Sequence, residues 1–129
     1  FGYEPGQIPQ LDTFSFKADK RLIELAEECC SRVNPDIHTF LGRVVTGDQF
    51  VSQKEKKEWL TKTFGGSCTE MEGGAIAQAC YLNNVPFLIL RAISDKADDS
   101  ASMDYPAFEA KAIQHSVNLM IEMIQNYEA

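Results

Sequence analysis

The sequence predicts an α/β fold in which helices pack on a largely parallel sheet. Segments with helical spacing of apolar residues alternate with short segments rich in β-branched residues, the order expected of such folds. Residues 85–93 form a nearly continuous apolar run, as in a strand buried on both faces of a sheet. The chain has 129 residues, of which 44% are hydrophobic, so one domain with a core is expected.

Helices and strands are predicted in alternation along the chain. Helices are expected where apolar residues recur at three- and four-residue steps, over residues 18–33, 53–64, 73–82 and 105–127. Strands are expected in β-branched or continuously apolar segments, over residues 39–46, 67–71 and 85–93. Proline and glycine indicate a loop or edge segment over residues 1–16, and polar residues indicate a second loop over 94–104.

Local signals predict where these helices begin and end. Asn34-Pro35-Asp36 should end the first helix, because the residue before a proline disfavours helical backbone. Ser52 is placed to cap the second helix, and Gly65-Gly66 should end it. In the last helix, the face expected to meet the core consists of Phe108, Ile113, Val117, Met120, Ile121 and Ile124.

Charge and composition argue against several classes of function. The net charge is -7 and lysine and arginine form no long cluster, so binding to a nucleic-acid backbone is not expected. The longest apolar run, residues 85–90, is far too short to cross a bilayer, so no membrane partner is expected. Small-molecule ligands remain open.

The cysteines and histidines show no spacing typical of a metal site. Cys29, Cys30, Cys68 and Cys80 form no CxxC pair, so we expect free thiols in a reducing compartment and a cytoplasmic location. Surface or structural roles are expected for the only two histidines. The sequence therefore predicts neither a metal nor a cofactor.

Polar or aromatic residues follow each of the three predicted strands. These residues are Phe50 and Val51 after the first strand, Glu70, Met71 and Glu72 at the second, and Arg91, Ser94 and Asp95 at the third. Ligands of open α/β sheets bind at the carboxyl ends of the strands. If the three strands are neighbours, these side chains form one candidate site.

The residues after the second strand allow two interpretations. Glu72 precedes Gly73-Gly74 and could accept two hydrogen bonds from a diol such as a ribose, or it could simply complement the helix dipole. Met71 could lie against a sugar or base, and Phe50 could stack on a planar base. For each of these two side chains, a position in the protein core is the more common case.

The third strand end also allows a structural interpretation. Arg91 and Glu70 could form an ion pair that satisfies two charges at a desolvated strand end. Ser94 and Asp95 could serve as a turn or a helix cap. Residue types alone do not choose between these interpretations and a catalytic one.

Several segments resemble one enzyme family. EMEGGAIAQAC followed by NNVPFLILRAISDKAD resembles the signature of the nucleoside phosphorylase/nucleosidase superfamily. With FGYEPGQIP, FKAD and TGDQFV added, the chain resembles the 5'-methylthioadenosine/S-adenosylhomocysteine nucleosidases from Phe1 to about Ile124. The resemblance implies a three-layer sandwich with a central mixed sheet flanked by helices, of which residues 1–129 are the C-terminal portion of a single domain.

The resemblance implies a reaction and roles for individual residues. The reaction is hydrolysis of the N-glycosidic bond of 5'-methylthioadenosine, S-adenosylhomocysteine and 5'-deoxyadenosine, releasing adenine, in methionine salvage and S-adenosylmethionine recycling. Asp95 would protonate adenine N7, Ser94 would orient the Asp95 carboxyl group, and Glu72 would hold the ribose hydroxyls. Phe50 would stack on adenine, the backbone of Val51 would meet the base edge, and Met71 would lie against the sugar. Glu70 and Arg91 would lie near the attacking water. Tyr105 would border the 5' pocket, and Phe1 and Pro9 would reach into the neighbouring subunit of a homodimer.

The chain departs from this family in length and in one motif. Family members are considerably longer, and the unmatched part carries the first strands and the glutamate that activates water. The N-terminal segment of the same protein is therefore an expected partner, and residues 1–129 alone are expected to be inactive. Phe1 in place of Met agrees with a fragment or a processed product. Gly73-Gly74 replaces the commoner alanine followed by alanine or threonine, which should alter helix packing but not the ribose contact.

Two other functions remain open from the residues. A purine nucleoside phosphorylase would grip the base and ribose in the same way but would transfer the sugar to phosphate. A non-catalytic nucleoside-binding fragment would bind the ligand without turnover.

Overall fold

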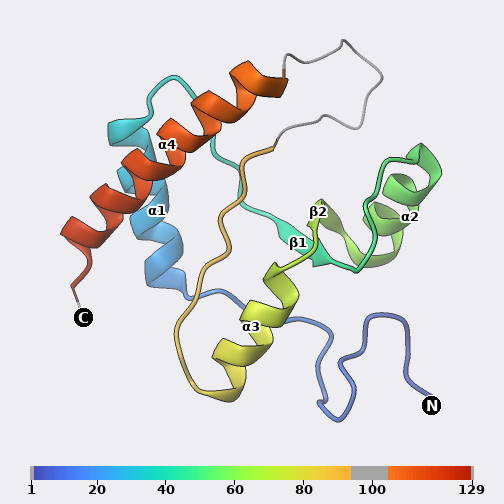
Figure 1. Ribbon diagram of the computed structural model, residues 1–129. Coiled ribbons are helices and arrows are strands. Elements are labelled where there is room, and N and C mark those ends of the chain that lie inside the picture. Colours follow the sequence, from blue (N-terminus) through green and yellow to red (C-terminus); the bar gives the residue numbers. More distant parts are fainter. Residues whose placement is uncertain (1, 94–104, 129) are drawn as a thin grey trace. The chain divides into compact units, whose positions relative to one another are not determined.

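A computed structural model describes residues 2–93 and 105–128, and the chain divides into two compact units. The first unit comprises Phe1–Asp19 and Gly42–Ile89, and the second comprises Lys20–Leu41 and Leu90–Ala129. Figure 1 shows helices in both units, whereas the two strands of the described residues, β1 and β2, belong to the first unit. The predicted α/β class is confirmed.

The first unit contains a small parallel sheet with two helices. β1 (Arg43–Thr46) pairs with β2 (Gly66–Glu70), and Thr46 lies opposite Glu70 in the register. α2 (Lys54–Phe64) connects the two strands, as parallel pairing requires. α3 (Gly73–Leu82) follows β2 and packs on β1. The predicted helices and the first two strands are confirmed, although β1 is shorter than expected.

The two ends of α2 differ from each other. Gly65 ends the helix in the left-handed region (φ 65°) and donates its N–H to the Thr61 carbonyl at 2.8 Å, as a glycine C-cap does. The predicted cap at Ser52 is wrong, because the first backbone bond of the helix runs from the Lys57 N–H to the Gln53 carbonyl at 3.1 Å. Gln53 is therefore the N-cap, and its side chain makes no capping hydrogen bond.

The prediction of a buried strand over residues 85–93 is wrong for the described chain. The segment forms neither helix nor strand, and Val85, Leu90 and Ile93 are 51%, 43% and 53% exposed. A central strand needs a hydrogen-bonded strand on each side. The sheet formed by the described residues holds only β1 and β2, which pair with each other. Within the first unit, the Asp19 N–H donates to the Phe87 carbonyl at 2.8 Å.

The second unit is built on a pair of long helices. α1 (Lys20–Val33) ends where the proline signal predicts, and α4 (Tyr105–Asn126) confirms the predicted last helix. The two helices pack on each other, and the buried residues in the described part of the unit are Ala26, Cys29, Cys30, Asn34 and Met123. None of the four cysteines, all of which lie in the described residues, forms a disulfide, as predicted.

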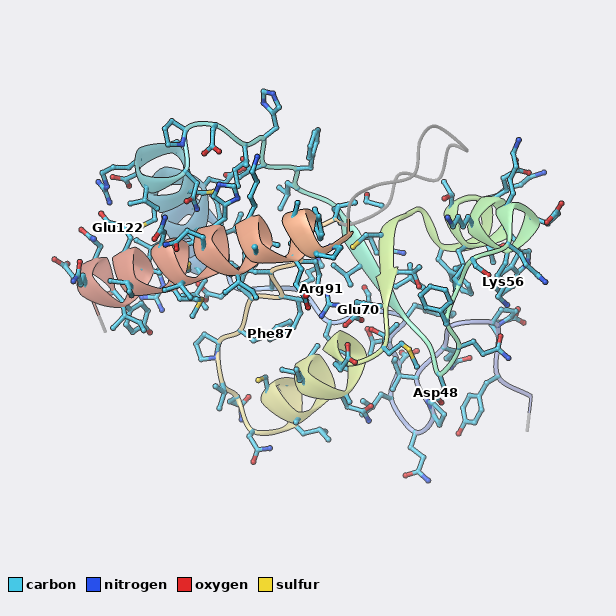
Figure 2. All side chains as sticks on the ribbon, turned by 45° about the horizontal axis from the view of Figure 1, so that its top comes forward. Asp48, Lys56, Glu70, Phe87, Arg91 and Glu122 are labelled. Atoms are coloured by element: carbon cyan, nitrogen blue, oxygen red, sulfur yellow. The ribbon has the colours of Figure 1, made fainter. Side chains whose placement is uncertain are left out.

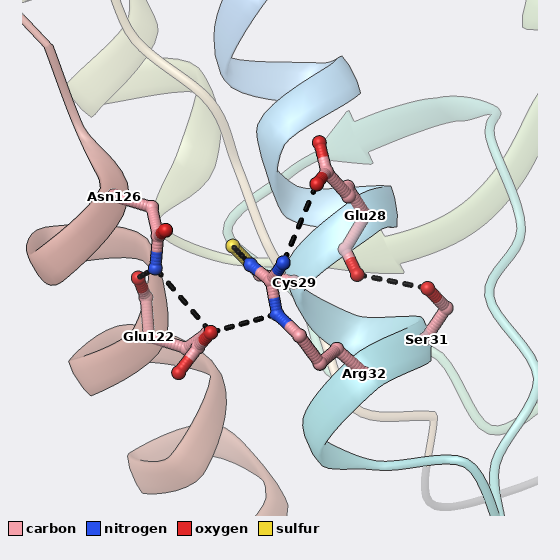
Figure 3. Close-up of polar contacts among 6 residues, drawn as sticks. All are labelled: Glu28, Cys29, Ser31, Arg32, Glu122 and Asn126. Carbon is pink, nitrogen blue, oxygen red and sulfur yellow. Dashed lines mark hydrogen bonds and ion pairs between the residues drawn. The ribbon is translucent and has the colours of Figure 1, made fainter.

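An ion pair joins the two helices of this unit. Arg32 Nε donates to Glu122 Oε1 at 2.8 Å, and the same guanidinium lies 3.4 Å from Glu28 and 3.7 Å from Cys29 Sγ (Figure 3). Partial desolvation lowers the pKa of Arg32, but the charge of Glu122 and hydrogen bonds to Cys29 and Glu122 raise it, and the net pKa lies above its ordinary value. The arginine therefore stays charged wherever the protein is folded at ordinary pH.

A buried asparagine ties the end of α1 to α4. Asn34 is 2% exposed, and its Nδ2 donates to the His115 carbonyl at 2.9 Å. Asn118 Nδ2 donates to Asn34 Oδ1 at 3.4 Å. His115 Nε2 also lies 3.1 Å from Asp36, which agrees with the structural role predicted for this histidine.

The predicted core face of α4 is wrong for five of its six residues. Ile113, Val117, Met120, Ile121 and Ile124, here called the apolar stripe of α4, are 47–71% exposed, whereas Phe108 is half-buried. α4 meets α1 through a different face, which carries His115, Asn118, Glu122 and the buried Met123. The helix therefore has one packed face and, within the described residues, a separate exposed apolar one.

Within the described ranges, none of the helices combines the length and hydrophobicity that crossing a membrane requires.

Candidate functional site

The carboxyl ends of β1 and β2 lie side by side. The strands are parallel, their last residues Thr46 and Glu70 are opposite each other, and the Gly47 N–H donates to the Glu70 carbonyl at 3.2 Å. Parallel strands present their carboxyl ends at one edge of the sheet. Two of the three strand ends predicted to form the site are therefore neighbours.

The Glu70 carboxylate is held at the start of α3. It is buried (7% exposed), and Figure 2 shows Glu70 where β2 leads into α3. Its Oε1 accepts a hydrogen bond from the Thr46 hydroxyl, and its Oε2 accepts from the N–H groups of Glu72 and Gly73 at 3.0 and 2.6 Å. A carboxylate at a helix N-terminus satisfies unpaired N–H groups and complements the helix dipole. Glu70 thus has the dipole-complementing role that the sequence offered as an alternative for Glu72.

Thr46 completes this arrangement from β1. Its hydroxyl oxygen accepts from the Gly74 N–H at 2.7 Å while its proton goes to Glu70. We call Thr46, Glu70 and the N–H groups of Glu72, Gly73 and Gly74 the Thr46–Glu70 network. It connects β1, β2 and α3 through two side chains.

The two glycines leave room for this network. A Cβ at Gly73 would lie 3.0 Å from the Glu70 carboxylate, and a Cβ at Gly74 would lie 2.9 Å from the Thr46 Cβ. Such distances are shorter than ordinary contacts, so a side chain at either position would force Glu70 or Thr46 to shift. The two glycines therefore allow a close contact between the start of α3 and the strand ends.

Glu72 presents its carboxylate at the surface. It occupies the N-cap of α3 with φ -123° and ψ -33°, makes no side-chain capping hydrogen bond, and is exposed. Its Oε2 accepts from the Met71 N–H at 3.3 Å. A carboxylate at an exposed helix start beside two glycines can accept hydrogen bonds from the hydroxyl groups of a ligand.

Two apolar side chains near the strand ends are exposed. Phe50, four residues after β1, is 84% exposed, and Met71, directly after β2, is 45% exposed. Neither is therefore a core residue of the first unit. Val51 beside Phe50 is half-buried. An aromatic ring and a thioether can contact the faces of a base and a sugar.

The described structure does not test the other predicted site residues. Pro9 is exposed in a turn of the N-terminal segment, and Arg91 is an exposed residue of the second unit. Tyr105 is the first residue of α4, and its side chain is not described. Phe1, Ser94 and Asp95 lie outside the described residues. Their roles stay predictions.

Sequence reasoning missed Thr46. The signal was a hydroxyl residue in the last position of a predicted strand, directly before Gly47-Asp48. Such a side chain can reach both a neighbouring strand end and a helix start. Its importance could be found only by knowing that Glu70 lies opposite it.

The first unit also contains a cavity of about 470 Å³. Its lining residues are Glu4, Pro5, Gly6, Phe14, Arg43, Thr63 and Phe64. Arg43 begins β1, so this cavity lies at the opposite end of the strand from Thr46 and is not part of the candidate site. Among residues 2–93 and 105–128, no group of three or more acidic, histidine or cysteine side chains has the arrangement of a metal site.

The chain matches the phosphorylase superfamily over residues 1–125. It is 36% identical over 126 residues to the 5'-methylthioadenosine/S-adenosylhomocysteine nucleosidase of Bacillus cytotoxicus, covering 97% of this chain and 54% of the relative. It is 38% identical over 125 residues to the enzyme of the same name from Haemophilus influenzae, covering 96% and 53%. The chain thus spans about half the length of the curated relatives it matches.

Solved structures agree with these relatives. A putative methylthioadenosine nucleosidase from Weissella paramesenteroides superposes with a TM-score of 0.86 at 37% identity, over 95% of this chain and 52% of that one. The nucleosidase of Neisseria meningitidis in complex with methylthio-immucillin-A gives 0.81 at 35%, over 98% and 54%. Futalosine hydrolase of Helicobacter pylori gives 0.80 at 33%, over 95% and 50%.

Proposed function

The chain belongs to the phosphorylase superfamily, and on that premise we propose that it is the C-terminal portion of a single nucleosidase domain. The whole protein would hydrolyse the N-glycosidic bond of 5'-methylthioadenosine, S-adenosylhomocysteine and 5'-deoxyadenosine and release adenine. This activity would serve methionine salvage and S-adenosylmethionine recycling in the cytoplasm. The observation that carries the proposal is the presentation of Glu72, Met71 and Phe50 at adjoining strand ends, in a chain that resembles nucleosidases along nearly its whole length.

The proposed ligand contacts follow from the exposed side chains. Glu72 holds the ribose hydroxyls, and Met71 lies against the sugar. Phe50 stacks on adenine, and the backbone of Val51 meets the base edge. The complex of the Neisseria meningitidis relative with methylthio-immucillin-A supports a nucleoside-shaped ligand for this family.

Asp95 and Ser94 would supply the acid side of the reaction. Breaking the N-glycosidic bond leaves negative charge on the purine and positive charge on the sugar. Asp95 gives its proton to N7, so that adenine leaves as a neutral molecule, and Ser94 orients the carboxyl group. Glu72 and other carboxylates near the sugar favour the developing positive charge.

Glu70 and Arg91 would lie near the attacking water. The contacts of Glu70 with Thr46, Glu72 and Gly73 support a structural role for its carboxylate in any case. Activation of the water requires a second carboxylate on the opposite side of the sugar, as in inverting glycosidases. We assign that base to the N-terminal segment of the protein, so residues 1–129 alone are expected to be inactive.

Two exposed apolar surfaces support the presence of a further protein segment. They are the apolar stripe of α4 and the segment 85–93, each of which carries large apolar side chains that are more than 40% exposed. Surfaces of this kind mark contacts with other polypeptide. We propose that the N-terminal segment covers them.

We also propose that the whole protein forms a homodimer. Phe1 and Pro9 would reach the 5' pocket of the partner subunit, while Tyr105 borders the pocket of its own subunit.

A second candidate substrate class has its own support. The similarity to Helicobacter pylori futalosine hydrolase extends over 95% of this chain, nearly the same coverage as for the nucleosidases. A futalosine-hydrolysing enzyme would keep the ribose contact of Glu72 with a different nucleoside bound. Phosphorolysis is the third possibility, since the superfamily is named for it.

The experiment is base release by the full-length protein from 5'-methylthioadenosine, S-adenosylhomocysteine, 5'-deoxyadenosine and futalosine. We expect adenine release from the first three substrates in phosphate-free buffer, and Asp95→Asn should lower it by orders of magnitude while ligand binding survives. A strict requirement for phosphate would show a phosphorylase, and preferential cleavage of futalosine would show the second class. Equal rates for Asp95→Asn and the parent would remove Asp95 from the mechanism.

A further inference from the structure

Thr46 lies outside every role assigned above, yet it is the only side chain of β1 that the described structure connects to both β2 and α3 by side-chain hydrogen bonds. Its hydroxyl donates to Glu70 Oε1 and accepts from the Gly74 N–H at 2.7 Å. A hydroxyl group has one proton to donate and can also accept, so both contacts can be made at once. A valine in this position would have the same shape and neither contact.

The position of the Glu72 backbone depends on the same network. Glu70 Oε2 accepts from the Glu72 N–H at 3.0 Å and from the Gly73 N–H at 2.6 Å. The carboxylate that fixes the Glu72 N–H is thus itself held by Thr46. Removing the Thr46 hydroxyl would leave one carboxylate oxygen and one helix N–H without this partner, and the start of α3 would move.

Gly73 and Gly74 indicate that this close contact is a specific feature of the chain. Glycine is a poorer helix former than alanine, because its backbone loses more conformational freedom on folding. Here each glycine admits a neighbour that a Cβ would meet at 3.0 Å or less: the Glu70 carboxylate for Gly73 and the Thr46 Cβ for Gly74. The helix start is therefore adapted to the presence of Thr46 and Glu70.

We propose that Thr46 is a positioning residue for ribose recognition: its hydroxyl, held between Glu70 and Gly74, sets the position from which Glu72 binds the sugar hydroxyls. This inference rests on the proposed function, because it takes the ribose as the ligand of Glu72. Thr46 itself touches neither the substrate nor the reacting atoms.

The test compares ribose discrimination in variants of the full-length protein. The quantity is kcat/KM for 5'-methylthioadenosine divided by kcat/KM for its 2'-deoxy and 3'-deoxy analogues. Because a displacement of about 1 Å in a binding group lowers rates by up to about a hundredfold, we expect Thr46→Val to lower this ratio at least about tenfold. Thr46→Ser keeps the hydroxyl and should restore the ratio of the parent, and Glu72→Gln should lower it as Thr46→Val does.

Thr69→Val is the matched control. Thr69 is an exposed residue of β2, opposite Val45, and its replacement by valine also removes a threonine hydroxyl from the same small sheet. Its ratio should equal that of the parent. If Thr46→Val does not fold, Gly74→Ala gives the same test, since its Cβ would displace Thr46 without removing the hydroxyl.

The outcomes separate this inference from the proposed function. A parent protein that releases no base from any nucleoside, with or without phosphate, overturns the proposed function and the role of Thr46 with it. The parent could instead be active while Thr46→Val lowers kcat/KM by the same factor for 5'-methylthioadenosine and for its 2'-deoxy and 3'-deoxy analogues. That result overturns only the role of Thr46, because the hydroxyl would then serve stability alone. The same conclusion follows if Thr46→Ser loses discrimination as Thr46→Val does.

Discussion

The start of α3 and the apolar stripe of α4 differ in how much of their surroundings the described chain supplies. At the start of α3, Glu70 is buried at 7% exposure and accepts hydrogen bonds from two strand ends and the helix. On α4, the stripe exposes 47–71% of each side chain, although another face of the same helix holds the buried Met123. Polar groups are satisfied in the first region, whereas apolar surface in the second is still in contact with solvent.

The binding geometry and the stability of the fold therefore depend on different lengths of chain. The Thr46–Glu70 network is formed between residues 46 and 74, within one unit. Burying the stripe of α4 requires polypeptide that the described residues do not supply. Substitutions in the network should therefore act within the chain itself, and substitutions in the stripe should act only where a covering segment is present.

The largest effect on stability is expected for Glu70→Ala. It removes a buried carboxylate and leaves the Thr46 hydroxyl and the N–H groups of Glu72 and Gly73 without this acceptor, which should lower the free energy of unfolding by about 3 kcal/mol. Glu58→Ala on the exposed side of α2 is the control and should change it by less than about 0.5 kcal/mol. Urea denaturation measures both, and equal effects would show that the network adds nothing to stability.

The two methionines of α4 give a matched test of its two faces. Met123 is 8% exposed and Met120 is 47% exposed. Met123→Ala should lower the free energy of unfolding by about 2–3 kcal/mol, because it leaves a cavity against α1. Met120→Ala should change it by less than about 0.5 kcal/mol in the 129-residue chain.

In the full-length protein the same pair tests whether the stripe is covered. If the N-terminal segment packs on it, Met120→Ala should become as destabilising as Met123→Ala. If Met120→Ala remains without effect in the full-length protein, the stripe is exposed there too and our proposed cover is wrong.

An intermediate effect is expected for the buried asparagine of the second unit. Asn34→Ala removes the hydrogen bond to the His115 carbonyl and the acceptor of Asn118, and should cost about 2 kcal/mol of unfolding free energy. Asn126→Ala removes contacts made only with Glu122 in its own helix and should cost less than about 0.5 kcal/mol. Thermal or urea unfolding distinguishes them, and a smaller loss for Asn34→Ala would mean that water replaces its contacts.

Local sequence signals predicted the bounds of the helices well, but they predicted poorly which segments pack against one another. The helix ends at Val33 and Gly65 and the start of α3 follow from proline and glycine, whose effects act within a few residues. The burial of residues 85–93 depends on a strand partner, and no signal within the segment says whether that partner is present. The apolar stripe of α4 was predicted as core for the same reason: helical spacing shows that a face is apolar, not what covers it.

The candidate site shows the same limit. The adjoining strand ends beside Met71 and Glu72 were predicted from strand order, because parallel strands share a carboxyl edge, but the exposure of Met71 was not. The role of Glu70 at the start of α3 was not, since it depends on Thr46 lying opposite it in the register. Asp95 and Ser94 lie outside the described residues, so their role is still a prediction.

The smallest effect is expected for Gly74→Ala, and it tests the fit between α3 and β1. A Cβ at this position would lie 2.9 Å from the Thr46 Cβ, which must move, and overpacking of this kind costs about 1–3 kcal/mol. Alanine also stabilises a helix relative to glycine by about 1 kcal/mol, so the net loss of unfolding free energy should be about 1 kcal/mol. Gly47→Ala, at a position with no atom within 4 Å of the added Cβ, should not lower stability. If the Gly74→Ala protein is as stable as the Gly47→Ala protein, β1 and α3 can move apart at no cost. The contrast between a fixed start of α3 and an uncovered stripe on α4 would then no longer hold.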